Sequence, residues 1–210
     1  MSRFVVRRAA EAKYLPPGPL IPGAIGITRW RCIGEDDGSA HSDFGILRIE
    51  PEGRSATHLH SFEYSFHVLE GETVLATPEA TVRLVAGDYG VVPIGVPHRW
   101  TGSGASVALI ADLITPPARE RHGSDTFQVA ELAVREPVAV DTRDPRTRSF
   151  GNITAEQMSP GRQSQELLAV SASMRTALLV YSGISLKMMV DSDLGATLSA
   201  MFMVQYEPDG

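Results

Sequence analysis

Three histidines are the residues of this sequence whose type and spacing can support chemistry. His58 and His60 are separated by one residue, and His98 follows a segment rich in glycine and proline, PIGVP. Residues two apart in a β-strand point to the same face, so the first two imidazoles can lie side by side. A Gly/Pro turn before His98 can return a neighbouring strand and bring a third imidazole to the same point. Neutral imidazoles suit zinc, iron, nickel and copper, so the pattern predicts a site for one divalent transition metal.

Residues close to these histidines are candidates for contacts with a substrate. Tyr64, Phe66 and Val68 share one parity along a predicted strand, and we expect Phe66 and Val68 to line the interior. Tyr64 is a candidate metal ligand or hydrogen-bond partner of bound water or substrate, and a core aromatic residue with a satisfied hydroxyl is the alternative. Arg99 and Trp100, beside the third histidine, can fix an anionic or planar substrate, although one of the two can simply be solvated or packed.

Two segments around the histidines resemble the two motifs of the cupin superfamily. Residues 53–71 read GRSATHLHSFEYSFHVLEG, and residues 87–102 read GDYGVVPIGVPHRWTG. The first resembles H-x-H-x3-E-x6-G with a glycine shortly before it, and the second resembles G-x5-P-x-G-x2-H-x3-N. The matching positions are Gly53, His58, His60, Gly71, Gly87, Pro93, Gly95 and His98. The resemblance implies a barrel that holds one metal ion through the three histidines.

The departures from these motifs also carry information. Tyr64 stands where many cupins have a glutamate ligand, and Glu63 beside it should point to the opposite face of a regular strand. Gly102 replaces the asparagine of the second motif. His67 should face outward. The resemblance therefore implies a first coordination shell of three neutral histidines, with iron, zinc, manganese and nickel as the candidate ions.

The elements that must position these residues are short strands. From Gly26 onward, β-branched and aromatic runs alternate with Gly, Pro and Asp, which predicts an all-β cupin barrel of the jelly-roll, double-stranded β-helix type. We expect an extended N-terminal arm over residues 1–23, the barrel over 24–115, a linker over 116–180 with a short helix at 163–176, and further strands over 181–210.

The last of these segments repeats an earlier one. Residues 26–53 align without a gap on residues 183–210, at an offset of 157, with eight identities that end in the shared pattern E-P-x-G. In the first copy the histidine motif follows at once. The repeat predicts a two-barrel (bicupin) protein truncated at the opening strands of its second cupin. Such strands would expose apolar edges, so we expect a homodimer or a larger assembly.

Composition excludes several functional classes. The net charge of −6 and the absence of a long Lys/Arg run argue against a nucleic-acid partner. The sequence has no apolar stretch typical of a membrane span or a secretory signal, so we expect a cytoplasmic protein with no membrane partner.

The leading functional hypothesis is a metal-dependent enzyme acting on a small organic molecule, with a dioxygenase-like cupin of the three-histidine iron type ahead of a hydrolase or isomerase. Cupin barrels host all of these activities, so the fold does not choose among them. Two alternatives stay open: a non-catalytic cupin that binds or senses a small ligand, and an oligomerisation domain whose site has decayed.

Overall fold

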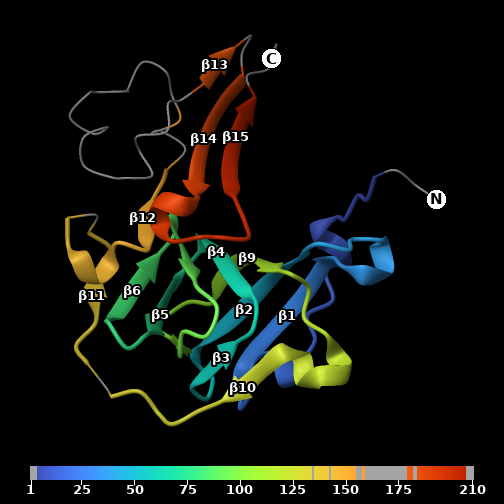
Figure 1. Ribbon diagram of the computed structural model, residues 1–210. Helices are drawn as coiled ribbons and strands as arrows, with labels where there is room; N and C mark the ends of the chain where they lie inside the picture. Colours follow the sequence, from blue (N-terminus) through green and yellow to red (C-terminus); the bar gives the residue numbers. More distant parts are fainter. Residues whose placement is uncertain are drawn as a thin grey trace.

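The computed structural model describes residues 4–133, 135–141, 143–154, 158, 179–181 and 184–206. A curled β-sheet closes around an apolar interior, and a long hairpin stands on one side of it (Figure 1). This arrangement confirms the predicted all-β barrel with additional C-terminal strands. The helix expected over residues 163–176 lies outside the described residues.

The elements have the following bounds. The strands of the barrel are β1 (Ile25–Ile33), β2 (Asp43–Arg54), β3 (His58–His60), β4 (Glu63–Glu70), β5 (Glu72–Ala76), β6 (Thr81–Val85), β7 (Asp88–Val92), β8 (Arg99–Gly102), β9 (Ala108–Thr115), β10 (Thr126–Gln128), β11 (Val138–Ala139) and β12 (Phe150–Asn152). The C-terminal strands are β13 (Leu179–Tyr181), β14 (Ile184–Val190) and β15 (Met201–Tyr206). Short 3-10 helices are η1 (Ala9–Glu11), η2 (Gly18–Leu20), η3 (Glu35–Asp37), η4 (Glu120–Asp125), η5 (Pro145–Thr147) and η9 (Ser192–Leu194).

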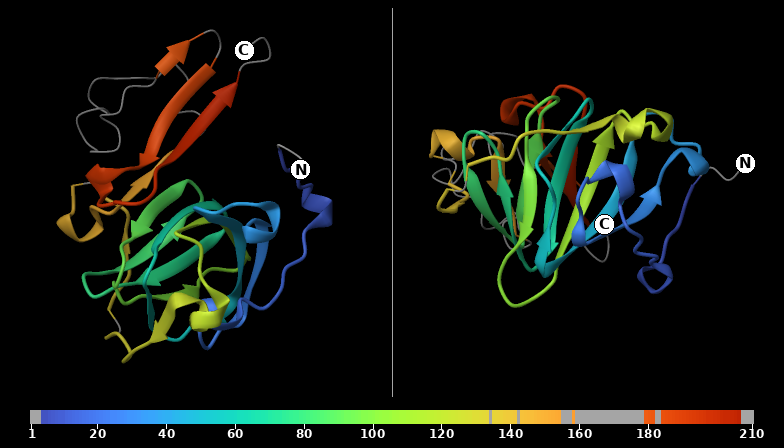
Figure 2. Two further views of the ribbon diagram at one scale, coloured as in Figure 1. Left: turned by 45° about the vertical axis from the view of Figure 1, so that its right-hand side comes forward. Right: turned by 90° about the horizontal axis from the view of Figure 1, so that it is seen from below.

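The main sheet runs in the order β11-β6-β5-β8-β2-β9-β4-β7-β12, with β1 paired to β2. Neighbours are antiparallel except for β11 and β6. Strand β2 alternates between buried and half-buried residues from Asp43 to Glu50, as expected where one face of a strand meets a core. Strand β7 is buried on both faces, because the barrel interior covers one side and the C-terminal strands approach the other (Figure 2).

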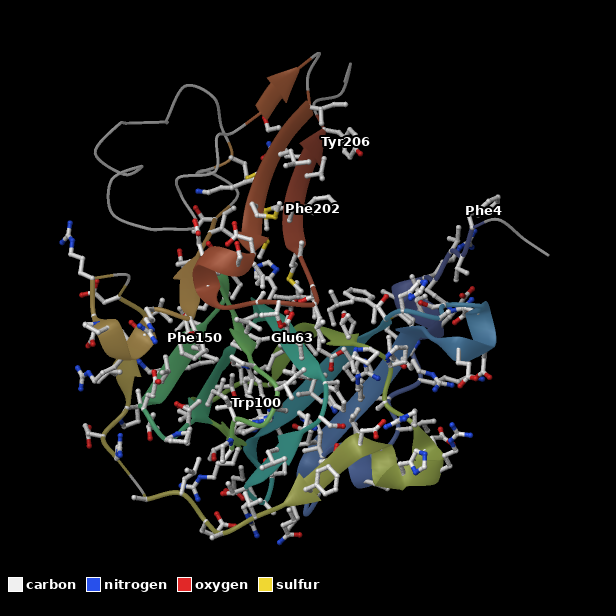
Figure 3. All side chains as sticks on the ribbon, viewed as in Figure 1. Phe4, Glu63, Trp100, Phe150, Phe202 and Tyr206 are labelled. Atoms are coloured by element: carbon white, nitrogen blue, oxygen red, sulfur yellow. The ribbon has the colours of Figure 1, made fainter. Side chains whose placement is uncertain are left out.

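The barrel interior is filled by aliphatic and aromatic side chains, with Trp100 at its centre (Figure 3). Members from β2, β4, β8 and β9 are almost completely buried: Leu47, Ile49, Tyr64, Phe66, Val68, Trp100, Ile110 and Ile114. The N-terminal arm contributes Leu20 and Ile21 to the same core. Burial of this apolar surface is the main stabilising contribution to the fold.

The segment expected to be a linker also takes part in the barrel. Strand β10 pairs with β3, β11 pairs with β6, and β12 pairs with β7. The barrel therefore continues past residue 115, where the sequence places its boundary. The polar composition that predicts a linker is compatible with short edge strands, which need few apolar side chains.

The C-terminal hairpin repeats the geometry of the first hairpin. Ile27 pairs with Ile49 in β1 and β2, and Ile184 pairs with Tyr206 in β14 and β15, so the offset of 157 holds in the register of both ladders. Each hairpin contains a 3-10 turn that ends at a left-handed glycine, Gly38 with φ 84° and Gly195 with φ 92°. Glycine tolerates this conformation without steric cost, which explains why it stands at both positions. The internal repeat is confirmed as a structural repeat.

Glu63 joins this hairpin to the barrel. Its buried carboxylate accepts hydrogen bonds from the backbone N–H groups of Thr197 at 2.6 Å, Leu198 at 3.2 Å and Ser199 at 2.9 Å, and from the hydroxyls of Thr197 and Ser199. Figure 3 shows Glu63 on β4 beneath the hairpin. The side chain therefore points away from the barrel interior, as strand parity predicts. A second apolar cluster, which includes Tyr89, Ile153, Met189 and Leu194, packs at the same junction.

Among the described residues, no helix is long and apolar enough to cross a membrane.

Candidate metal centre

The backbone holds the three histidines at one end of the barrel. His58 and His60 are the first and last residues of β3, and their side chains are buried while that of Leu59 is more exposed. An isolated antiparallel bridge joins His58 to His98 through reciprocal N–H to carbonyl hydrogen bonds of 2.9 and 2.8 Å. A third backbone bond, from Gly95 N–H to the His60 carbonyl, fixes the turn that leads to His98. The convergence predicted from sequence is present in the structure.

The imidazoles face one another closely. Their ring centroids are 4.9 Å apart for His58 and His60, 4.4 Å for His58 and His98, and 4.9 Å for His60 and His98. Each side chain offers one nitrogen to a group of donor atoms that all lie within 4.8 Å of one another. Zinc in proteins is bound by histidine nitrogens at about 2.0–2.1 Å, and three such nitrogens can hold an ion with positions left open.

Hydrogen bonds at the other ring nitrogen fix the tautomer of each histidine. Nδ1 of His58 lies 2.8 Å from the Ala56 carbonyl, and Nδ1 of His98 lies 3.1 Å from the Val96 carbonyl. A carbonyl can only accept, so each Nδ1 carries the proton and each Nε2 presents a lone pair. The Nε2 atoms of His58 and His98 are buried without a hydrogen-bond partner in the described part of the chain. Buried polar atoms are normally satisfied, so these two nitrogens fit a bound cation.

Burial keeps the three rings neutral. It lowers the pKa of His58, and it lowers that of His60 well below its ordinary value, with His98 and His58 contributing further. Burial, together with repulsion from His58, lowers the pKa of His98 to about 3. Neutral imidazole is the form that ligates metal ions, so at neutral pH the site needs no deprotonation step before it binds one.

Tyr64 lies beside the histidines but its hydroxyl is engaged elsewhere. The ring centroid is 5.9 Å from His60 and 6.2 Å from His98, and the hydroxyl donates to Asp112 Oδ2 at 3.2 Å. Burial and the adjacent Asp112 carboxylate raise the pKa of Tyr64 well above its ordinary value. The phenol is therefore protonated, which disfavours the phenolate ligand considered from sequence.

Asp112 is in turn part of a buried ion pair. Its carboxylate accepts two hydrogen bonds from Arg29 Nε, at 2.8 and 3.0 Å, and one from Nη2 at 2.7 Å, while Nη2 also bonds Asp43 at 2.7 Å. Burial alone would lower the pKa of the guanidinium, but the two carboxylates outweigh it and raise that pKa. The charges are thus paired and hydrogen-bonded, which is the condition under which they are tolerated in an interior.

The three predicted substrate-contact residues are in the core. Phe66, Val68 and Trp100 are almost completely buried, and the rings of Phe66 and Trp100 meet edge to face at 5.3 Å. Tyr64 lies next to this pair, 6.3 Å from Trp100. These side chains form the layer below the imidazoles rather than an open mouth.

Arg99 is not brought to the histidines. Strand parity turns it away from Trp100, and its Nη1 pairs with Glu131 at 3.3 Å. Glu131 also accepts from the Thr57 hydroxyl at 2.8 Å. The guanidinium therefore links β8 to the segment after β10. The sequence made Arg99 a candidate for substrate contact because it is adjacent to His98, but adjacency does not reveal which face of the strand a side chain takes.

Two residues at the site have no counterpart in the sequence prediction. Phe62 stacks on His60 with ring centroids 4.1 Å apart, and it also lines a cavity of about 630 Å³ together with residues 116–119. Phe62 shares the parity of the histidine pair, so strand alternation could have identified it. Thr126, whose hydroxyl oxygen lies 2.9 Å from His60 Nδ1, is 66 residues away in sequence and carries no local signal.

Comparison with known proteins agrees with this geometry. Residues 45–114 match the family model of the cupin domain, Cupin_2. No curated protein sequence matches the chain. Among solved structures, the polyketide cyclase RemF from Streptomyces resistomycificus is 22% identical over 71% of this chain and 98% of its own, with a TM-score of 0.50. A predicted oxalate decarboxylase from Thermotoga maritima is 19% identical, covering 53% of this chain and 99% of its own, with a TM-score of 0.48.

A sugar phosphate isomerase from Silicibacter pomeroyi is 22% identical, covering 53% of this chain and 75% of its own, with a TM-score of 0.45. At these identities the likeness concerns the fold alone. Residues 45–114 are thus similar in sequence to the cupin domain, and the barrel of this chain is similar in fold to that of RemF.

Proposed function

We propose that the barrel binds one divalent transition-metal ion through Nε2 of His58, His60 and His98 and acts there on a small organic molecule. The observation that carries the proposal is the pair of buried Nε2 atoms without a partner, combined with Nδ1 atoms that are all hydrogen-bonded. When bound, such an ion can polarise a substrate oxygen or lower the pKa of a water molecule.

The residues around the ion would then have different roles. The three imidazoles hold the ion, while Phe62 and Tyr64 form apolar walls beside them. The Arg29 and Asp112 pair keeps the Tyr64 hydroxyl turned away from the imidazoles. Of the activities open to a cupin, we favour a dioxygenase-like reaction, because imidazole ligands suit iron and three of them leave coordination positions open.

Metal analysis tests the first half of this proposal. Protein purified without chelator should contain close to one equivalent of a transition metal per chain, and His98→Ala should reduce that content strongly. His67→Ala is the matched control, because His67 lies on β4 outside the ligand group. Equal metal content in both variants, or none in the unmodified protein, would contradict the assignment.

Oxygen consumption tests the second half. If iron is the ion, the unmodified protein should take up oxygen with candidate catechols, gentisate-like acids or thiols, and His98→Ala should not. Replacement of the motif glutamate by Tyr64, whose hydroxyl donates to Asp112, favours a second candidate, a metal-bearing barrel that binds or senses a ligand without turnover. Tight retention of an unaltered ligand with no oxygen uptake would select that alternative.

We also infer that the hairpin of β14 and β15 is the opening hairpin of a second cupin repeat. The identical register of the two hairpins supports this inference. In the first hairpin, the edge of β2 that faces away from β1 pairs with β9. Among the described residues, no strand occupies the corresponding edge of β15. We propose that a second copy of the chain covers it, because two identical strands related by a two-fold axis present complementary antiparallel edges.

A further inference from the structure

The segment from Arg119 to Gln128 lies outside the family match, yet it contacts the candidate metal centre. Strand β10 pairs with β3 in the register Thr126 with His60 and Gln128 with His58. His58 and His60 thus lie on a strand whose partner, β10, is not part of the cupin motifs. The role inferred below for this segment rests on the proposed metal site.

The hydroxyl of Thr126 has a defined hydrogen-bond direction. Its Oγ1 donates to the Ser124 carbonyl at 2.9 Å, which uses its single proton. The same oxygen lies 2.9 Å from His60 Nδ1, so it can only accept there and Nδ1 must carry the proton. The lone pair of His60 is thereby assigned to Nε2, the nitrogen that faces the other two imidazoles.

His60 differs from the other two histidines in its source of support. Nδ1 of His58 and Nδ1 of His98 are held by carbonyls two residues earlier in the chain, Ala56 and Val96. These contacts are local and arise from the backbone of the motifs themselves. His60 alone depends on a side chain, and that side chain comes from a distant segment.

The turn that presents Thr126 is built at a conformational cost. Ser124 and Asp125 both adopt left-handed backbone angles, with φ of 55° and 51°, which non-glycine residues rarely take. The Asp125 carboxylate compensates by accepting from the Arg119 backbone N–H at 2.9 Å and from Nε and Nη2 of its guanidinium at 2.8 and 2.6 Å. The Asp125 carbonyl also accepts from Ser61 N–H at 2.9 Å, one residue after His60.

We infer that Thr126 is a positioning residue for the metal, which orients His60 and fixes its tautomer through the chain His60 Nδ1–H to Thr126 to the Ser124 carbonyl. Partners of this kind beyond the ligands typically change metal affinity by about 10 to 100-fold when removed. Thr126→Val keeps the shape of the side chain but removes the acceptor. Thr126→Ser keeps the hydroxyl and should restore affinity.

Cobalt(II) titration of the full chain against a competing chelator tests the inference. We expect Thr126→Val to weaken Co²⁺ binding by about 10 to 100-fold and Thr126→Ser to bind within a few-fold of the unmodified protein. Thr73→Val is the matched control, because its buried hydroxyl also donates to a carbonyl, that of Thr101 at 2.9 Å, and has no part in the histidine contacts. It should bind Co²⁺ normally.

A second readout reports on the ring itself. In the Co²⁺ form, each Nδ1–H should give a solvent-exchangeable, paramagnetically shifted proton signal, and Thr126→Val should lose or broaden the one from His60. Normal affinity and an unchanged set of signals in Thr126→Val would overturn the inference, as would a Thr126→Ser protein that binds as weakly as Thr126→Val. Absence of Co²⁺ binding by the unmodified protein would instead overturn the metal site.

Discussion

The hydroxyl of Tyr64 donates to the carboxylate of Asp112 at 3.2 Å, so the residue at the motif glutamate position is bound to an internal ion pair. Tyr64→Phe should therefore leave the metal content unchanged and cost about 1 kcal/mol in the free energy of unfolding, the usual net contribution of one hydrogen bond. Urea denaturation and metal analysis measure the two quantities. Loss of the metal in Tyr64→Phe would show that the phenol ligates it after all.

The Arg29 and Asp112 pair should matter much more for stability. In Asp112→Ala the buried guanidinium of Arg29 loses one of the two carboxylates that it contacts and keeps Asp43. Breaking a buried ion pair in this way lowers the free energy of unfolding by about 3–5 kcal/mol. Glu50→Ala is the control, because the side chains of its pair with Arg48 are 39% and 41% exposed to solvent and the pair should contribute at most about 1 kcal/mol. Similar unfolding midpoints for the two variants would contradict this view of the interior.

Glu63→Gln should loosen the C-terminal hairpin without emptying the metal site. The amide would oppose the N–H groups of residues 197–199 with donors of its own, and hydrogen bonds to a charged acceptor contribute about 1.5–3 kcal/mol each. We expect faster hydrogen exchange over residues 184–206, measured by mass spectrometry. Glu70→Gln, an exposed change on the same strand, should leave exchange unaltered. Protection that survives in Glu63→Gln would mean that the apolar cluster around Met189 suffices.

The contribution of Asp125 to the stability of the metal-free protein should depend on pH. Hydrogen bonds from Arg119 hold the pKa of Asp125 at about 2, below its value of about 3.9 in an unfolded chain. A depressed pKa contributes stability that is fully present above about pH 4 and is lost as the pH falls toward 2. The difference in unfolding midpoint between the unmodified protein and Asp125→Asn should thus shrink between pH 5 and pH 3. A difference that stays constant over this range would argue against the pairing.

Self-association should depend on the exposed face of the hairpin. Phe202 and Tyr206 are 52% and 67% exposed on β15, and Figure 3 shows both on the projecting part of the molecule. Phe202→Lys adds a charge to an edge that we expect to pair with its own copy, which should shift light scattering from dimer to monomer. Phe4→Lys, a change at an apolar side chain of the N-terminal arm that is 74% exposed, should leave the dimer intact. A monomeric unmodified protein would contradict the proposed pairing.

The sequence alone determines the part of this site that arises from local geometry. The spacing of His58 and His60 and the Gly/Pro turn before His98 predict three converging imidazoles, because strand parity and turn preference act over a few residues. The same local rules predict the outward direction of Glu63. The hairpin repeat is also visible in sequence, since a register that recurs requires a pattern that recurs.

Only the tertiary structure decides what the remaining side chains contact. The partners of Tyr64, His60 and Glu63 are Asp112, Thr126 and the backbone of residues 197–199, which are 48, 66 and 134 to 136 residues away. No periodicity connects positions so far apart, because these contacts depend on how the strands close into a barrel and not on the conformation of either segment. For the same reason the sequence predicts a substrate contact for Arg99, because Arg99 is next to His98, whereas in the folded chain Arg99 pairs with Glu131.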